Sequence, residues 1–231
     1  MSGPDPSASL AQRALTGLAK FQLALALLIF LPAWSLSYWQ GFVYWCVFGA
    51  ATLALTLYFL RHDPALVERR MHAGPAAERE TSQKIIQTLA SLFVCAIFVV
   101  SALDYRFGWS PVPDRDALLG DVLALVGFAI MFLAFRANGF ASSIIETGSG
   151  QTVISSGPYT LVRHPMYSGA LLLFFATPLA LGSRFGFAPA FLLTATIVWR
   201  LLAEEAYLAR NLPGYREYQQ RVAWHLVPYI W

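Results

Sequence analysis

The strongest constraint on this chain is the length of its apolar blocks. A helix needs about 20 mostly apolar residues to cross a hydrocarbon core of about 30 Å. Hydrophobic residues make up 57% of the 231 residues and charged residues 13%, which is more apolar surface than a soluble fold of this size can bury. We therefore predict an all-α, polytopic integral membrane protein with about six transmembrane helices, at residues 21–36, 42–60, 85–103, 117–135, 167–182 and 187–203.

Polar segments between these blocks divide the chain into three parts. Residues 1–20 form a polar and then amphipathic N-terminal segment. Residues 21–135 hold four predicted spans and a charged loop at 61–84. Residues 136–231 hold a polar stretch, a predicted helical hairpin at 167–203 and a polar, aromatic tail. The last two spans are therefore flanked on both sides by polar segments that can carry chemistry.

The distribution of lysine and arginine predicts the orientation of the spans. All but three of the 16 Lys and Arg residues fall in segments that share one side of a six-span topology, and the exceptions are Arg106, Arg115 and Arg184. Cytoplasmic loops are enriched in these residues. We therefore predict a multi-pass protein of the inner or plasma membrane with both termini cytoplasmic. The fifth block is short, so five spans and a re-entrant segment are the alternative.

The formal net charge of +3 is spread along the chain without a basic patch, so we expect no nucleic-acid partner. The expected partners are the lipid bilayer and a lipophilic substrate, and no feature indicates an obligate protein partner. Cys46 and Cys95 both fall inside apolar blocks. We expect them to be packed thiols, and two such residues predict neither a disulfide nor a metal site.

The polar stretch before the fifth block carries a dense run of turn-forming and polar residues. They are Gly157, Pro158, Tyr159, Arg163, His164, Pro165 and Tyr167. Gly157 with Pro158 predicts a tight turn, and Pro165 predicts the first position of a helix. A helix N-terminus favours anions, and a neighbouring arginine favours carboxylates. Two interpretations remain open: a site for an anion, or an interfacial loop in which Arg163 contacts lipid phosphate and His164 is a cap.

A second polar cluster, Arg200, Glu204 and Glu205, follows the last apolar block. Ionisable residues there are costly unless they are paired or functional. Arg200 and Glu204 are four residues apart and can meet on one helix face, whereas Glu205 points about 100° away. The alternative is a solvated helix end with one intrahelical ion pair and an arginine that extends to the interface.

In chain order the two clusters belong to a longer series of motifs. The series is Asn138-Gly139-Phe140, Val153, Gly-Pro-Tyr, Arg-His-Pro-Met-Tyr, a hydrophobic hairpin, Arg-x-x-x-Glu-Glu, Gly-Tyr-x-x-Tyr and a closing Val-Pro-Tyr-Ile-Trp. Over residues 136–231 it resembles the isoprenylcysteine carboxyl methyltransferase family and its bacterial relatives, which share this C-terminal core with phospholipid N-methyltransferases. The resemblance implies an S-adenosylmethionine-dependent methyltransferase with a lipophilic acceptor and a cofactor pocket on the cytoplasmic face, formed by the C-terminal half.

The resemblance also implies roles for single residues. It implies catalytic roles for Arg163, Arg200 and Glu205. The cofactor-binding positions that it implies are Gly157, Tyr159, His164, Pro165, Tyr167, Glu204 and Glu205. The acceptor group can be a carboxylate, a thiol, a phenol or an amine, and Glu205 or a tyrosine is the candidate base for a thiol or an amine.

Two other functions compete with this hypothesis. One is a membrane reductase of the steroid-reductase type, which would use NADPH. The other is a non-enzymatic scaffold or transporter subunit. Transport predicts polar or broken-helix positions near the middle of the bilayer, but the polar residues of this chain gather at one face.

Overall fold

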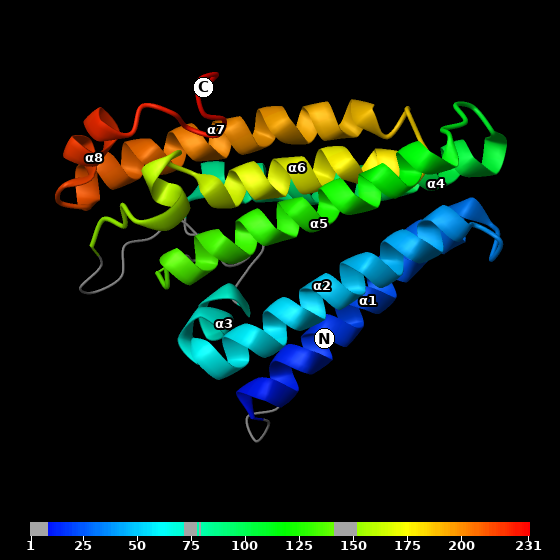
Figure 1. Cartoon of the computed structure of the whole chain (residues 1–231), viewed down its shortest axis with the longest axis horizontal. Coiled ribbons are helices and arrows are strands. Elements are labelled where there is room, and N and C mark those ends of the chain that lie inside the picture. The colour runs from blue at the N-terminus through cyan, green and yellow to red at the C-terminus, as the bar shows by residue number, and fades with distance from the viewer. Residues whose placement is uncertain (1–8, 72–77, 79, 141–151) are drawn as a thin grey trace.

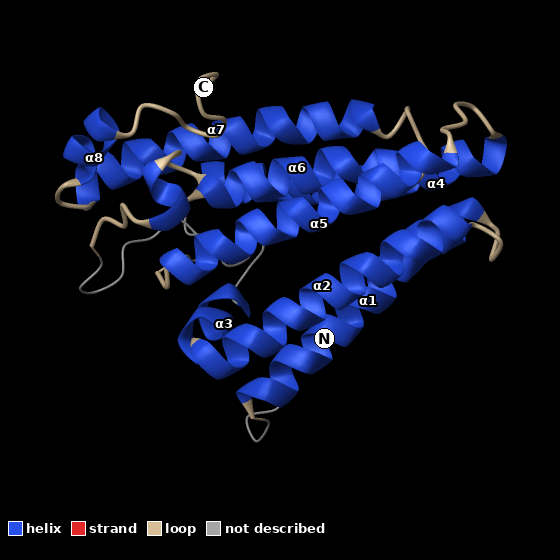
Figure 2. Cartoon of the chain, viewed as in Figure 1, coloured by secondary structure: helices blue, strands red, loops and turns tan. Residues whose placement is uncertain are grey.

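The computed structural model describes residues 9–71, 78, 80–140 and 152–231, and this part of the chain is helical with no strand (Figure 2). Five helices are long and apolar enough to cross a membrane. They are α1 (Leu10–Ala33), α2 (Trp39–His62), α4 (Thr81–Phe107), α5 (Asp114–Ala137) and α7 (Phe187–Asn211). A shorter apolar helix, α6 (Pro165–Ala180), accompanies them. The predicted class, an all-α polytopic membrane protein, is confirmed.

Three short elements lie at one end of the bundle, which we call the α8 end (Figure 1). They are α3 (Pro64–Met71), the 3-10 helix η1 (Gly157–Thr160) and α8 (Tyr215–Arg221). The opposite end holds the α1–α2, α4–α5 and α6–α7 connections. Helices α4 to α7 run alongside one another, and the α1–α2 pair diverges from α5 toward the α8 end (Figure 1).

Hydrogen bonds at the opposite end show how far the short helix α6 extends. Leu181, directly after α6, accepts a hydrogen bond of 2.5 Å from the Tyr38 hydroxyl in the α1–α2 connection. Ser183 donates a hydrogen bond of 2.6 Å to the buried carboxylate of Asp104 in the last turn of α4. Asp104 also accepts from the backbone N–H of Ser110 at 2.8 Å. Within the described residues, α6 therefore runs between the two ends of the bundle, as α1, α2, α4, α5 and α7 do, although it is shorter than these five helices.

Helices α5 and α6 pack with almost no side chain between their backbones. A Cβ atom added to Gly127 of α5 would lie 2.8 Å from the carbonyl oxygen of Gly169 and 2.9 Å from the nitrogen of Leu173. A Cβ atom added to Gly169 would lie 2.7 Å from the carbonyl oxygen of Gly127. Small residues allow such close approach of helices within membranes. This contact fixes α6, whose first turn forms part of the site, against α5.

Two predicted helix boundaries differ from the structure by more than four residues. Helix α1 begins at Leu10 rather than near residue 21, because Ser9 and Gln12 form a capping box. The Gln12 backbone N–H donates to Ser9 Oγ at 3.3 Å, and the Ser9 N–H donates to Gln12 Oε1 at 2.9 Å. Helix α7 continues to Asn211 rather than ending at 203, so it carries Arg200, Glu204 and Glu205 as helical residues.

The prediction of packed cysteines is wrong. Cys46 and Cys95 are free thiols, and both are exposed on the surfaces of their helices. An apolar helix in a small bundle presents much of its surface to lipid, so position within an apolar block does not imply burial against protein.

Candidate functional site

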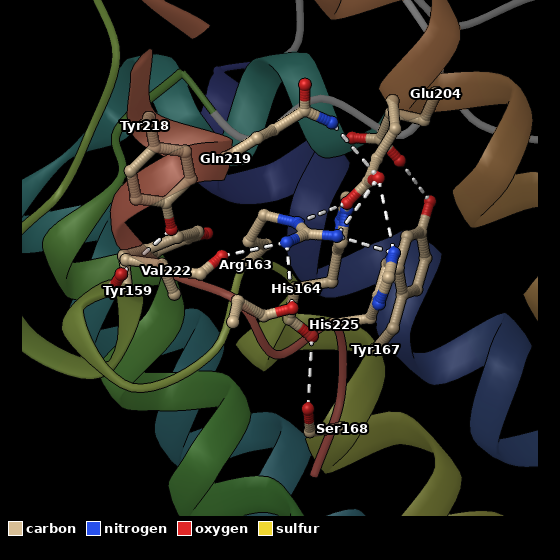
Figure 3. A network of polar contacts seen from close by, with 12 residues as sticks. Tyr159, Arg163, His164, Tyr167, Ser168, Glu204, Tyr218, Gln219, Val222 and His225 are labelled. Carbon is tan, nitrogen blue, oxygen red and sulfur yellow. Dashed lines mark hydrogen bonds and ion pairs between the residues drawn. The ribbon is translucent and has the colours of Figure 1, made fainter. Parts of the chain in front are cut away.

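The polar site forms where the start of α6, the last turns of α7 and the C-terminal tail meet (Figure 3). The predicted turn is present as η1, and Gly157 has a φ of +57°, a left-handed conformation that favours glycine. Pro165 is the first residue of α6, as predicted. The backbone N–H groups of Arg163 and His164 donate to the carbonyls of Trp224 and His225 at 2.9 and 3.0 Å. The tail is thereby paired with the turn before α6.

Arg163 is buried and uses its whole guanidinium within the protein (Figure 3). Its Nε donates to Oε1 of Glu205 at 2.6 Å, and its Nη2 donates to Oε2 at 3.3 Å. Its Nη1 donates to the carbonyls of Val222 at 2.7 Å and Ala223 at 2.9 Å. Its Nη2 also donates to Nε2 of His225 at 2.5 Å. A guanidinium has five N–H donors, so Arg163 can bind another acceptor only by giving up one of these contacts.

The carboxylate of Glu205 contacts side chains from three other parts of the chain. Its side chain is 9% exposed and pairs with Arg163. His164 Nε2 lies 3.0 Å from Oε1, and Gln219 Nε2 of α8 donates to Oε2 at 3.2 Å. His225 Nε2 lies 3.4 Å from Oε2. The carboxylate therefore joins α7 to the start of α6, to α8 and to the tail.

His225 was not predicted from the sequence as a site residue. Burial lowers the pKa of His225, and the neighbouring positive charge of Arg163 lowers it further, whereas Glu205 raises it. A neutral imidazole nitrogen can accept the hydrogen bond from Arg163 Nη2. The ring also stacks on Trp231, with ring centroids 4.4 Å apart. The closing motif of the sequence thus supports the site through this histidine.

Tyr167 links Arg200 to Glu204. The Tyr167 hydroxyl donates to Oε2 of Glu204 at 2.7 Å, and Arg200 Nε donates to the same hydroxyl at 3.1 Å. The predicted proximity of Arg200 and Glu204 is therefore mediated by a tyrosine from α6. Glu204 is partly exposed, whereas Glu205 is buried. The prediction that the two glutamates face different neighbours is confirmed.

Arg200 has two further partners from the first half of the chain. Its Nη2 forms an ion pair with Oε1 of Glu78 at 2.8 Å, and the Glu78 side chain is 2% exposed. Its Nη1 donates to Oε1 of Gln83 in the first turn of α4 at 3.2 Å. The C-terminal half alone was predicted to form the cofactor pocket, but the structure brings Glu78 and Gln83 into the same polar network.

Tyr159 connects η1 to two other elements. Its hydroxyl accepts from Nδ2 of Asn138 at 3.3 Å, and its carbonyl accepts from the Tyr218 hydroxyl of α8 at 2.8 Å. Burial raises the pKa of Tyr159 to about 12, so the phenol keeps its proton at neutral pH. The motifs containing Asn138, Tyr159 and Tyr218 are thus adjacent in space, although they are far apart in the sequence.

The fold and this network define a polytopic helical membrane protein with a polar site at one end of its last two apolar helices. Residues 116–213, from α5 to the end of α7, match the family model described as phospholipid methyltransferase. Isoprenylcysteine carboxyl methyltransferase-like membrane methyltransferases share this family, so the resemblance expected from the sequence is confirmed over that segment. The match indicates a membrane methyltransferase as the general class. No curated protein gives a significant match to this chain.

Proposed function

We propose that the protein is an S-adenosylmethionine-dependent methyltransferase that acts on a lipophilic acceptor at the cytoplasmic face of the membrane. The observation that carries the proposal is that the matched segment contains both polar clusters and that the fold joins them at one end of the bundle. The positions of Arg106, Arg115 and Arg184 at the opposite end support a cytoplasmic α8 end. A site there is open to a cofactor from the cytosol and to an acceptor from the bilayer.

The residues present fit the charges of S-adenosylmethionine. Glu204 offers a partly exposed carboxylate for an ammonium group or a ribose hydroxyl. The backbone N–H groups of Met166 and Tyr167 in the first turn of α6 suit a carboxylate because they lack intrahelical acceptors. The rings of His164 and Tyr167, whose centroids are 5.7 Å apart, add aromatic surface that tolerates a cation. When bound, the cofactor supplies an electrophilic methyl group on its sulfonium.

We assign two roles to the three expected catalytic residues on the basis of their contacts. Arg163 and Glu205 hold the start of α6, the end of α7 and the tail in register, which is a positioning role. Arg200 donates a hydrogen bond to the Tyr167 hydroxyl. It thereby orients this hydroxyl, which donates a hydrogen bond to Glu204. Methyl transfer depends on an in-line approach of nucleophile, methyl carbon and sulfur, so the precision of this arrangement affects the rate.

Calorimetric titration of S-adenosylmethionine into the detergent-purified protein tests the proposal. We expect binding to the wild type and about tenfold weaker binding to Glu204→Gln, because a charge-assisted hydrogen bond is lost. Glu217→Gln, the same change at an exposed position of α8, is the matched control and should bind as the wild type does. Failure of the folded protein to bind S-adenosylmethionine would overturn the proposal, and NADPH binding instead would favour the reductase.

A further inference from the structure

A cavity of about 630 Å³ lies between α1, α2, α3 and the last turn of α5. Its volume is within the range of small-molecule sites. The apolar walls come from Leu18, Phe21, Leu55, Phe59, Leu66 and Phe135. Thr52 and Thr56 also line it, but their hydroxyls donate to carbonyls of their own helix, to Phe48 and Thr52 respectively, each at 2.8 Å. The walls therefore suit a hydrocarbon chain, and we call this cavity the tail groove.

Two arginines give the tail groove a charged margin at the α8 end. Arg13 and Arg70 both line it. The Arg13 Nη2 lies 3.4 Å from Oε1 of Glu68, while its buried Nε has no acceptor within the described residues. The guanidinium of Arg70 lies over the ring of Phe135, with Cζ 4.5 Å from the ring centroid. A hydrocarbon tail in the groove would thus end beside two cations, which is the charge pattern that an anionic amphiphile complements.

Arg70 also connects the tail groove to the polar site. Its Nη1 lies 3.6 Å from Sδ of Met166, the second residue of α6. A head group held at Arg70 would therefore be next to the start of α6, where the proposed cofactor contacts lie.

We propose that the tail groove binds the hydrocarbon chain of the methyl acceptor and that Arg13 and Arg70 hold an anionic group, a carboxylate or a phosphate, at its head. This inference rests on the proposed methyltransferase function for the identity of the ligand as substrate. The binding itself is a property of the groove and can be measured without turnover.

Photolabelling of the full-length protein in detergent tests the groove directly. The probe is a long-chain fatty acid with a diazirine in its chain, and the corresponding long-chain alcohol is the uncharged probe. We expect the acid to label peptides of α1, α2 and α3, and unlabelled fatty acid to compete with this labelling. We expect the competable labelling by the alcohol to be about tenfold weaker. Lysophosphatidic acid as competitor distinguishes the two anionic heads, since the preferred head displaces the probe at lower concentration.

Substitutions in the groove separate specific binding from contact with bulk lipid. Gly17 lines the groove, and a Cβ atom added to it meets no atom within 4 Å, so we expect Gly17→Leu to fill part of the groove and to abolish competable labelling. Leu23→Phe, at an exposed position of α1 outside the groove lining, is the matched control and should label as the wild type does. Arg70→Gln should reduce acid labelling to the level of the alcohol. Arg13→Gln, which leaves the contact with Phe135 intact, should act in the same direction.

Two results would overturn the inference. The first is that the acid and the alcohol give the same competable labelling. The second is that Gly17→Leu leaves the labelling unchanged. A parallel titration with S-adenosylmethionine keeps the two proposals apart. Cofactor binding without groove labelling removes only the groove, whereas groove labelling without cofactor binding leaves a lipid site on a protein that is not this methyltransferase.

Discussion

At the scale of single residues, the contacts of Arg163 distinguish a positioning role from direct binding of substrate. All of its donors are used by Glu205, His225 and two tail carbonyls. We expect Arg163→Gln to lower the free energy of unfolding by about 3–5 kcal/mol, because it leaves a buried carboxylate without its cation. Equilibrium unfolding in mixed micelles measures this change.

A double-mutant cycle tests whether the Arg163 effect comes from the ion pair. We expect the double variant Arg163→Gln, Glu205→Gln to lose less stability than the sum of the two single variants, because each single variant leaves one buried charge unpaired. Arg216→Gln, at an exposed position of α8, should change stability by no more than about 0.5 kcal/mol. Additive losses would show that the two side chains stabilise the protein independently.

His225 predicts how the stability of the site depends on pH. Its pKa in the folded protein is lowered, so the unfolded chain takes up the proton first as the pH falls below its ordinary value of about 6.5. Stability from the neutral ring is therefore present above about pH 6.5 and is lost as the pH falls, by at most about 1.4 kcal/mol per pH unit.

Thermal unfolding measured between pH 7.5 and 5 tests this dependence. We expect His225→Gln to flatten the decline in Tm, because glutamine can accept the hydrogen bond from Arg163 but does not titrate. His62→Gln, which removes an exposed imidazole at the end of α2, is the control for general loss of a histidine. An unaltered slope in His225→Gln would assign the pH dependence to another group.

At the scale of secondary-structure elements, the close contact of α5 and α6 determines where the site begins. The first turn of α6 carries Pro165 and Tyr167, and the contact of Gly127 with Gly169 sets its position against α5. We expect Gly127→Ala to destabilise the protein by about 1–3 kcal/mol, because the new methyl group would overlap the backbone of α6. Denaturant titration measures the loss, and Gly17→Ala, where a Cβ meets open space, is the matched control.

The same substitution tests whether helix packing supports the site. If α6 moves away from α5, the link from Tyr167 to Glu204 lengthens. We then expect Gly127→Ala to weaken S-adenosylmethionine binding in the titration described above, while Gly17→Ala leaves it unchanged. Lost stability with unaltered cofactor binding would show that the glycine contact serves the fold alone.

At the scale of the whole molecule, local sequence pattern predicted the six apolar helices and which end of the bundle is polar, but not the short helices α3 and α8. Apolar length indicated all six helical blocks, and Gly157 and Pro165 indicated the turn and the start of α6. Spacing along α7 indicated that Glu204 and Glu205 face different neighbours, because helical periodicity fixes direction. Those features depend only on residues close together in the chain.

The partners of these side chains depend on residues that are distant in the chain, so spacing could not indicate them. Glu78 and Gln83 pair with Arg200 only because α4 packs against α7. His225 and Gln219 reach Glu205 only because the tail folds back over the start of α6. The capping box at Ser9 and Gln12, by contrast, is a local signal that could have placed the start of α1. The groove margin formed by Arg13 and Arg70 is another product of tertiary packing.

The orientation of the bundle is the whole-molecule property on which the proposed function depends. Residue 231 follows α8 in the chain, so we expect both to lie on one side of the membrane, and the segregation of Arg106, Arg115 and Arg184 predicts that this side is cytoplasmic. We expect green fluorescent protein fused after residue 231 to fluoresce, and alkaline phosphatase inserted at Ser110, in the α4–α5 connection, to be active. Exchanging the two reporters should silence both, because each works on one side only. The reverse pattern would expose the site to the outside, where S-adenosylmethionine from the cytosol does not reach it, so this experiment tests the fold's orientation and the proposed chemistry together.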